Sequence, residues 1–357
     1  MSSHQMKAVA LYGTGKVAVE EVDIPKAGPG EAIIQIEAAG ICAGDRIMYE
    51  GKAPWGEVTK RMVLGHEYVG VVTELGEGAA QEMHVQLGDR CLAEVQIPCM
   101  KCYYCRHGWY NLCDDPNGFL EGGWADYMRI RRGAIVHKVP KSIDKLEAAM
   151  IEPLSCAAHG VERAEISMKD VVVISGMGAI GLGMIQFARL RTPYTLIGLD
   201  VNDKMLEMAK QLGADYVFNP TACNVQEEIK KLTDGRGADI YIEASGNGVS
   251  LETGLEVLRK RGRMVAYGVY PKPALLDFNM VSENKELEIR GGHLSPGTYP
   301  FVIQCLEKGL VTAKPLVTDV YTFDEIEAAL HAKKTNPLSI KTVLVPSRPA
   351  SGQGTER

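Results

Sequence analysis

Four cysteines stand within 15 residues of the chain, in the stretch "CMKCYYCRHGWYNLC". Cys99, Cys102, Cys105 and Cys113 are separated by two, two and seven residues. Four thiolates this close in sequence can surround one tetrahedral zinc ion, and a site with four protein ligands has no open position for a reactant. An iron–sulfur cluster can also use four cysteines. The spacing therefore predicts a structural metal site, with zinc as the first choice.

A glycine-rich stretch, "VVVISGMGAIGLGMIQFARL", follows the spacing GxGxxG directly after an apolar strand and at the start of a helix. In that context the motif binds the pyrophosphate of a dinucleotide. We expect Gly176 to permit a tight turn, Gly178 to let the backbone approach the pyrophosphate, and Gly181 to let helix and strand pack closely. The helix start at Ala179 and Ile180 offers free N–H groups and a partial positive charge to the phosphates.

Asp200 stands at the end of the next predicted strand, 19 residues after Gly181. A carboxylate there can accept hydrogen bonds from the adenosine ribose, and it repels a 2′-phosphate. The alternative is a glycine turn that only packs an α/β domain, with Asp200 as a helix cap. The order of strand, glycines, helix and acid favours a cofactor site, and the acid favours NAD over NADP.

The bulk composition excludes several classes of protein. The net charge is −6 and there is no long basic run, so we expect neither nucleic acid nor a membrane as a partner. No apolar segment reaches the length of a membrane span, and the first residues lack a signal-peptide core, which favours a cytoplasmic protein. Nine cysteines in a reducing compartment are metal ligands or buried thiols rather than disulfides.

The elements that must position these residues are of two kinds. Short β-rich runs broken by Gly and Pro fill the first 150 residues, for example "EAIIQIEAAG" and "YVGVVTELG". Helical spacing begins near Ser142, in "SIDKLEAAMIEPLSCAAHGVERA", where Ser142 and Asp144 are candidate N-caps. After Gly292 the chain returns to short mixed elements, and a strand leads into a closing helix over 312–334.

From Lys169 onward, predicted strands alternate with helices. The strands cover 170–176, 195–200, 215–219, 238–245, 262–268 and 287–292, and the helices between them include 204–213, 225–235 and 251–260. This alternation predicts an α/β domain with a parallel, doubly wound sheet. We therefore expect a β-rich domain made of 1–153 and 290–357, with a cofactor domain at 154–289 inserted into it.

With these motifs in view, the chain resembles the zinc-dependent medium-chain dehydrogenase/reductase family. The matching stretches run from Lys7 to Val345 and include "GICAGD", "LGHEYVGVV", "GDRC", "GGWADYM" and "IEPLSCAAHG". The resemblance implies a Rossmann domain inserted into a β-rich, GroES-like catalytic domain. It points to the polyol branch, typified by sorbitol dehydrogenase, because Glu152 stands where simple alcohol dehydrogenases have a cysteine.

The resemblance also implies a catalytic zinc, and so two zinc ions per chain. Cys42 and His66 match two ligands of the family motif, and Glu67 and Glu152 match its two glutamates. Zinc held by a thiolate, an imidazole and a carboxylate keeps one position open, where it makes an alcohol more acidic before hydride passes to the nicotinamide. Which glutamate binds directly stays open at this point. Asp45 is expected to orient His66 through its other ring nitrogen.

Each candidate residue of the catalytic zinc site also has a simpler structural interpretation when it is considered alone. A lone Cys42 would be a packing thiol, His66 and Glu67 a surface pair, Glu152 a helix-face carboxylate, and Asp45 a turn residue. Their joint occurrence at the family's spacing favours the metal site.

The chain departs from the family at the usual proton relay. Gly44 stands where a Ser or Thr is usual, and Ile47 where a His is common, and neither can transfer a proton. Zinc-bound water or Glu152 is our first hypothesis for the acceptor, followed by Tyr49 and His293. Ser155 and His159 are expected to pack instead.

The expected activity is oxidation of a secondary alcohol of a small polyol to a ketose with NAD (class EC 1.1.1.-). A carboxylate-lined zinc site suits a substrate with several hydroxyls, and we name erythritol or threitol first. Trp55 can narrow the pocket or pack on the surface. The alternatives are L-threonine 3-dehydrogenase, a simple alcohol dehydrogenase and a non-catalytic zinc-binding relative. The resemblance further implies a homodimer or homotetramer.

Overall fold

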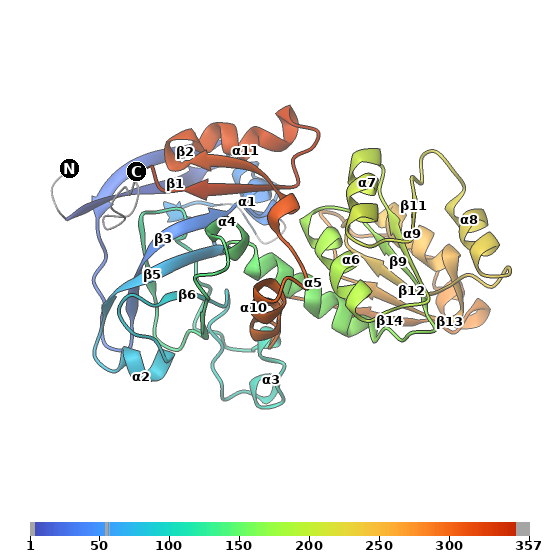
Figure 1. Cartoon of the computed structure of the whole chain (residues 1–357), viewed down its shortest axis with the longest axis horizontal. Helices are drawn as coiled ribbons and strands as arrows, with labels where there is room; N and C mark the ends of the chain where they lie inside the picture. Colours follow the sequence, from blue (N-terminus) through green and yellow to red (C-terminus); the bar gives the residue numbers. More distant parts are fainter. Residues whose placement is uncertain (1–3, 54–55, 57, 348–357) are drawn as a thin grey trace. The chain divides into compact units, whose positions relative to one another are not determined.

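The computed structural model of the chain describes residues 4–53, 56 and 58–347. The chain divides into two compact units, one made of Met1–Glu152 with Tyr299–Arg357 and the other of Pro153–Thr298. The second unit extends further toward the carboxyl terminus than the predicted 154–289. Each unit is described separately below (Figure 1).

The first unit is rich in β-structure. A three-stranded sheet has the order β2-β1-β4, and a seven-stranded sheet has the order β15-β16-β3-β5-β6-β8, with β7 paired to β3. The strands are β1 (Gln5–Gly13), β2 (Lys16–Asp23), β3 (Ala32–Gly40), β4 (Met62–Val63), β5 (Tyr68–Leu75), β6 (Arg90–Ala93), β7 (Tyr127–Ile130), β8 (Val136–Lys138), β15 (Val317–Thr322) and β16 (Lys341–Val345). Apart from the parallel pair β15–β16, neighbouring strands in both sheets are antiparallel. β16, from the end of the chain, thus lies beside β3, so residues about 300 positions apart in sequence meet at one place.

The helices of the first unit are short and lie between its strands. They are α1 (Ala43–Tyr49), α2 (Ala79–Met83), α3 (Tyr103–Arg106), α4 (Lys145–Ala148), α10 (Tyr299–Glu307) and α11 (Ile326–Thr335), with the short turns η1 (Tyr110–Leu112), η3 (Lys314–Leu316) and η4 (Phe323–Glu325). Helix α5 (Ile151–Ala164) begins at the end of this unit and continues into the next.

The single helical run predicted over 142–164 is two helices. Asp144 caps α4 by accepting a hydrogen bond from Leu146 N at 2.8 Å, whereas Ser142 is not an N-cap. The backbone leaves the helix at Ala149 and Met150, and α5 starts again at Ile151. The apolar spacing continues across this break because both helices bury one face, so the pattern alone does not reveal it.

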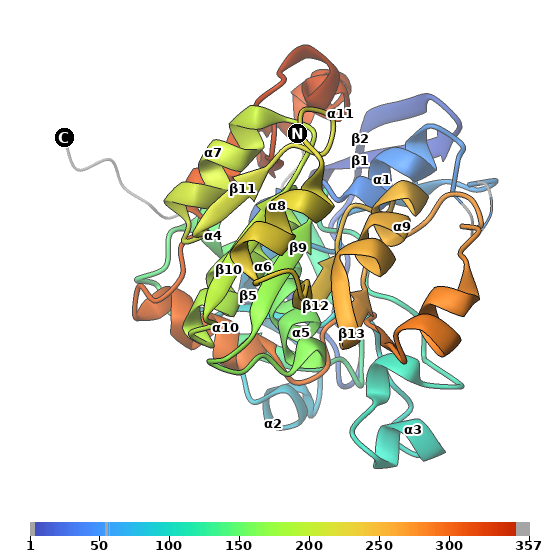
Figure 2. The ribbon, with the colours of Figure 1, turned by 90° about the vertical axis from the view of Figure 1, so that its right-hand side faces the viewer.

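The second unit is an α/β domain with one parallel sheet. Its strand order is β11-β10-β9-β12-β13-β14, the doubly wound order 3-2-1-4-5-6, which confirms the predicted fold class. The strands are β9 (Val171–Ser175), β10 (Thr195–Leu199), β11 (Tyr216–Phe218), β12 (Ala238–Glu243), β13 (Leu258–Ala266) and β14 (Glu288–Gly291). Figure 2 shows β10, β9, β12 and β13 side by side. Strand order reverses between β9 and β12, where sheets of this kind bind their ligands.

Helices α6 (Ala179–Leu190), α7 (Asp203–Gln211), α8 (Val225–Leu232), α9 (Gly248–Val257) and the π-turn η2 (Met280–Asn284) connect these strands. Helix α9 ends before the predicted 260. Lys285 Nζ donates to the carbonyls of Leu255, Glu256 and Leu258 at 2.6, 2.8 and 2.7 Å. A lysine at a helix carboxyl end neutralises the helix dipole and satisfies the last carbonyls, which stabilises the end at this position.

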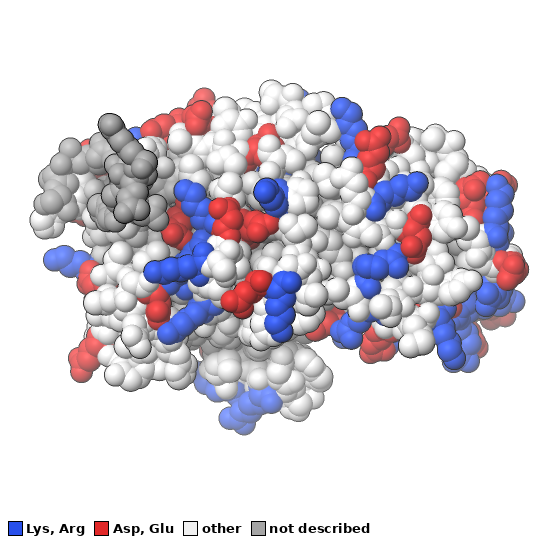
Figure 3. Space-filling model, in the orientation of Figure 1, with Lys and Arg blue, Asp and Glu red and all other residues white. Residues whose placement is uncertain are grey.

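Burial follows the expected pattern for a sheet covered on both faces. All five residues of β9 are buried, and three of them are valines whose branched side chains suit a buried strand. Among the described residues, no helix combines the length and apolarity needed to cross a membrane. On the face drawn in Figure 3, Lys and Arg side chains are interspersed with Asp and Glu.

Candidate metal and cofactor sites

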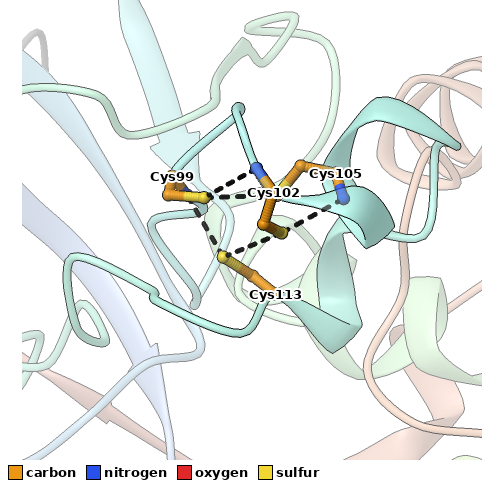
Figure 4. A group of neighbouring side chains, drawn as sticks. All are labelled: Cys99, Cys102, Cys105 and Cys113. Atoms are coloured by element: carbon orange, nitrogen blue, oxygen red, sulfur yellow. Dashed lines mark hydrogen bonds between the residues drawn. The ribbon is translucent and has the colours of Figure 1, made fainter.

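The four cysteines of the "CMKCYYCRHGWYNLC" stretch come together around one point (Figure 4). Cys99 Sγ lies 4.0 Å from Cys105 Sγ, and Cys102 Sγ lies 4.0 Å from Cys113 Sγ. Backbone N–H groups of Cys102 and Cys105 donate to the sulfurs of Cys99 and Cys102 at 3.3 and 3.5 Å. Such N–H···S bonds stabilise thiolates rather than thiols.

The spacing of the sulfurs suits a single ion. Zinc–sulfur bonds of about 2.3 Å in a tetrahedron place neighbouring sulfurs about 3.8 Å apart, close to the separations found here. Backbone hydrogen bonds, first from Cys105, lower the pKa of Cys102 to about 6, whereas burial raises the pKa of Cys105 to about 12. A cation at the centre of the group would stabilise the thiolate form of Cys105 as well.

The buried carboxylate of Glu94, which was not predicted from the sequence, connects the segment that carries the four cysteines (residues 99–113, the cysteine lobe) to the sheet of the first unit. Glu94 follows β6, and its Oε1 accepts hydrogen bonds from Tyr110 Oη at 3.1 Å and from His137 Nε2 at 3.0 Å. Tyr110 belongs to the turn between Cys105 and Cys113, so the lobe is fastened to β6 and β8 through one side chain. Because Glu94 is only 6% exposed, both bonds also compensate the burial of its charge.

Cys42, in the second candidate metal site, is the N-cap of α1. Its sulfur accepts from Gly44 N at 3.4 Å, and Asp45 Oδ2 accepts from Cys42 N at 2.8 Å, which forms a capping box. Arg46 on the same helix donates to Thr342 Oγ1 at 2.8 Å and to Leu330 O at 3.2 Å. These bonds attach the short helix to β16 and α11 and so hold Cys42 in place.

The structure brings Cys42 together with His66 and Glu67. One ligand atom of each lies within 4.8 Å of the others, a separation that one ion with ligand bonds of about 2.0–2.3 Å can span. Burial and then Glu67 raise the pKa of Cys42. Burial lowers the pKa of His66, but Asp45 and the contacts with Cys42 and Glu121 raise it well above its usual value. A thiol, an imidazole and buried carboxylates are the donor set that zinc takes, so the residues present fit this ion.

Glu67 is not a surface residue, since its carboxylate is buried and forms an ion pair with Lys341 of β16. Lys341 is 5% exposed, and although burial lowers its pKa, Glu67, Cys42 and Glu152 raise it overall. Gly40, at the end of β3, makes room for the Glu67 carboxylate, because a Cβ there would meet Glu67 Oε2. Sequence reasoning did not identify Lys341; the available signal was a charge at the start of the apolar run "KTVLV".

Asp45 is not the nearest carboxylate to His66. His66 Nδ1 lies 3.1 Å from Glu121 Oε1 and 3.8 Å from Asp45 Oδ1. Asp45 is 1% exposed, and burial raises its pKa to about 7 despite the nearby His66. Glu121 carries no sequence signal of its own, because it lies 55 residues from the histidine it contacts.

Glu152 is the second residue of α5 and is 7% exposed. It is close enough to Lys341 to raise the pKa of that lysine, but it is not in the group formed by Cys42, His66 and Glu67. Of the two glutamates, Glu67 is the one in the group whose ligand atoms all lie within 4.8 Å of one another. The direct ligand role of either glutamate remains a prediction.

The positions considered for proton transfer lie near Cys42, at the end of α1 and in the second unit. Gly44 contributes only backbone near Cys42, and the ring of Tyr49 packs against His331 with centroids 5.8 Å apart. His293 belongs to the second unit, where burial lowers its pKa. Trp55 lies outside the described residues. The choice of proton acceptor stays a prediction.

The glycine loop of the second unit has the geometry of a phosphate cradle. Gly176 has φ of +95°, and a Cβ at Gly181 would lie 1.8 Å from Gly176 O, so neither position tolerates a side chain. A Cβ at Gly178 would meet nothing within 4 Å. Gly178 is also the N-cap of α6 and provides no side-chain cap, which leaves the N–H groups from Ala179 onward for a ligand.

Asp200 follows β10 directly and anchors the glycine loop. Its Oδ2 accepts from Met177 N at 2.7 Å and its Oδ1 from Asn202 N at 2.8 Å. Each carboxylate oxygen has a second lone pair, so these bonds leave capacity for ribose hydroxyls. The site residues therefore fit a dinucleotide.

Two family models match the chain. Residues 28–141 match the alcohol dehydrogenase GroES-like domain, and residues 179–308 match the zinc-binding dehydrogenase. Both matches agree with the predicted resemblance.

Three curated relatives span nearly the whole chain. An erythritol/L-threitol dehydrogenase of Mycolicibacterium smegmatis is 39% identical, over 96% of this chain and 98% of its own. A sorbitol dehydrogenase of Halalkalibacterium halodurans is 35% identical, over 96% and 99%. An L-threonine 3-dehydrogenase of Pyrococcus abyssi is 37% identical, over 91% and 93%.

Solved structures with the same fold contain nicotinamide cofactors. A zinc-binding dehydrogenase of Sinorhizobium meliloti bound to NADP has a TM-score of 0.86 and 28% identity, over 96% of this chain and 99% of that one. A short chain alcohol dehydrogenase of Escherichia coli complexed with NADH has a TM-score of 0.86 and 26% identity, over 96% and 100%.

Proposed function

Because the chain belongs to the polyol branch of the zinc-dependent medium-chain dehydrogenases, we propose that it oxidises a secondary alcohol of a small polyol to a ketose with NAD. The chain is an alcohol or polyol oxidoreductase that uses zinc and a nicotinamide cofactor on a small-molecule alcohol. The proposal adds the identity of the dinucleotide, the substrate and the roles of individual residues.

The observation that carries the proposal is the group of Cys42, His66 and buried Glu67, with Glu152 near the lysine that pairs with Glu67. These side chains would hold the catalytic zinc, and the four cysteines would hold a second, structural one. When bound, zinc acts as a Lewis acid that makes a substrate hydroxyl more acidic. Buried carboxylates can also accept hydrogen bonds from the neighbouring hydroxyls of a polyol, and an apolar primary alcohol has no such hydroxyls.

The second unit would bind the dinucleotide, which accepts the hydride. Gly178 has open space beside it where the pyrophosphate would bind, and the uncapped N–H groups at the start of α6 would donate to it. The Asp200 carboxylate supports NAD, because a 2′-phosphate next to a carboxylate costs electrostatic energy. Relatives of the fold bind either dinucleotide, so titration of the protein with NADH and NADPH tests this choice: tighter NADPH binding would refute it.

The substrate is proposed to be a four-carbon polyol, erythritol or L-threitol. The name of the Mycolicibacterium relative supports this choice, and the name of the Pyrococcus relative supports L-threonine as the second candidate. Initial rates of NAD reduction with erythritol, L-threitol, sorbitol, L-threonine and ethanol separate the two. We expect the highest kcat/KM for a four-carbon polyol, and a higher value for threonine or ethanol would overturn the assignment.

We further propose a cytoplasmic homodimer or homotetramer. In the sheet order of the second unit β14 is an edge strand, and edge strands commonly pair between subunits. None of the nine cysteines, all of which lie in the described residues, is in a disulfide, which suits a reducing compartment. Sedimentation velocity of the zinc-loaded protein tests the assembly, and a monomer at micromolar concentration would contradict it.

A further inference from the structure

The histidine of the proposed catalytic zinc site has two carboxylates beside the same ring nitrogen. Glu121 Oε1 is 3.1 Å from His66 Nδ1, within hydrogen-bonding distance, whereas Asp45 Oδ1 is 3.8 Å away. The other Asp45 oxygen already accepts from Cys42 N at 2.8 Å. Asp45 is thus engaged in capping α1, and Glu121 is the direct partner of the imidazole.

Backbone pairing holds Glu121 beside His66. Gly123 N donates to Gly65 O at 2.8 Å, and Trp124 N donates to Leu64 O at 3.0 Å. The two segments approach so closely that a Cβ at Gly65 would lie 2.4 Å from the Trp124 ring, and a Cβ at Gly123 would lie 2.8 Å from Gly65 O. This pairing holds His66, next to Gly65, and Glu121, two residues before Gly123, in fixed relative positions, so their contact does not depend on a flexible loop.

The environment of the contact is largely shielded from water. The Glu121 side chain is 21% exposed and the His66 side chain 17%. Glu121 Oε2 is buried and has no hydrogen-bond partner among the described residues, so the contact with His66 is the interaction that compensates the burial of this carboxylate. A hydrogen bond to a charged acceptor in such surroundings is stronger than one between neutral groups.

We infer that Glu121 is a positioning residue of the catalytic metal site, which holds His66 Nδ1–H and so leaves Nε2 for zinc. The inference rests on the proposed zinc at Cys42, His66 and Glu67. A carboxylate on the outer nitrogen of a metal-binding histidine fixes its tautomer and ring orientation and raises its basicity as a ligand. Sequence reasoning gave this role to Asp45 alone; the geometry assigns the direct contact to Glu121.

The test compares zinc affinities of the zinc-loaded full chain and its variants in competition with a chelator. Removal of such a carboxylate weakens metal binding by about 10–100-fold. We expect Glu121→Ala to lower the affinity of the more weakly held zinc by that factor, and Glu121→Gln to lower it less, because an amide oxygen still accepts the hydrogen bond. Should Glu121→Ala fail to fold, the Glu121→Gln variant still carries the comparison.

A matched control is Glu94→Gln, which removes another carboxylate from a histidine outside the Cys42 group. It should leave the affinity of the weaker zinc unchanged. Asp45→Asn separates the two carboxylates: an unchanged affinity for Glu121→Ala together with a loss for Asp45→Asn would overturn the inference in favour of Asp45.

A spectroscopic measurement distinguishes positioning from general destabilisation. With cobalt in place of the weaker zinc, Glu121→Gln should shift the visible absorption bands, which report the ligand field, while the thermal midpoint stays the same. Unchanged bands and an unchanged affinity would refute the inference. Absence of any chelator-sensitive zinc in the wild-type chain would refute the proposed function instead.

Discussion

The buried ion pair between Lys341 and Glu67 leads to a stability prediction that depends on burial alone. Lys341 is 5% exposed and Glu67 2%, so in the metal-free protein the substitution Lys341→Met leaves a buried carboxylate without its counter-charge. Removing one partner of a buried pair costs about 3–5 kcal/mol, whereas removing both is often nearly neutral. We therefore expect Lys341→Met to destabilise the first unit by about this amount and Lys341→Met/Glu67→Gln to cost clearly less.

Urea unfolding followed by tryptophan fluorescence measures this effect. The described tryptophans, Trp109 and Trp124, belong to the first unit, and Trp124 Nε1 donates to Gly40 O at 3.0 Å, next to the Glu67 carboxylate. With a slope of about 2–3 kcal/mol per molar urea, the midpoint of Lys341→Met should fall by about 1–2 M.

A surface lysine provides the control for this substitution. Lys138 pairs with Asp89 at 2.6 Å, but their side chains are 53% and 28% exposed, so Lys138→Met should cost less than about 1 kcal/mol. If Lys341→Met costs no more than Lys138→Met, then Lys341 is not the main counter-charge of Glu67 and the reasoning is wrong. A double variant as unstable as Lys341→Met would also contradict it.

The other predictions concern Gly181 and Gly178, the four-cysteine group and the half-buried His159. Gly181→Ala should lower the free energy of unfolding by about 1–3 kcal/mol, measured by thermal unfolding, because its Cβ would overlap Gly176 O. Gly178→Ala should leave the stability unchanged but weaken NADH binding in a fluorescence titration. Equal stabilities of the two variants would contradict the prediction for Gly181. Cys102→Ser should reduce the zinc content by one ion per chain and lower the thermal midpoint, and an unchanged zinc content would refute the structural site. Burial lowers the pKa of His159 to about 4, and Arg163 and His293 add to this effect. Between about pH 6.5 and pH 4 this histidine is therefore protonated in the unfolded chain but neutral in the folded chain, so the free energy of unfolding decreases as the pH falls. His159→Gln should make this part of the stability–pH curve shallower in urea melts at several pH values, and an identical curve would show that His159 does not titrate as described.

The cofactor half could be predicted from sequence because its signals are local. Gly176, Gly178 and Gly181 lie within six residues, directly after the all-buried strand β9, so a single turn of backbone determines their arrangement. Asp200 directly follows the neighbouring strand β10, and parallel neighbours end at the same edge of the sheet. The boundaries were less predictable: α9 ends at Val257 because Lys285, 28 residues later, binds its last carbonyls.

The details of the candidate zinc site could not be predicted in the same way. Lys341 reaches Glu67 because β16 pairs with β3 across some 300 residues of sequence, and Glu121 reaches His66 because Gly65 and Gly123 let two segments approach. Such contacts follow from strand pairing and backbone approach, which periodicity does not encode. Sequence reasoning identified the candidate ligands through resemblance, and the groups around them became visible only in three dimensions.

The central claim is that the Cys42 group holds a zinc ion on which polyol oxidation depends. The most direct measurement is the initial rate of NADH formation from erythritol or L-threitol by the zinc-loaded wild type and by Cys42→Ala. Since a Lewis acid contributes several kcal/mol to such a reaction, we predict that the variant loses one zinc per chain and about a thousandfold or more in rate. A variant that retains both zinc ions, or a rate within tenfold of the wild type, would contradict the account.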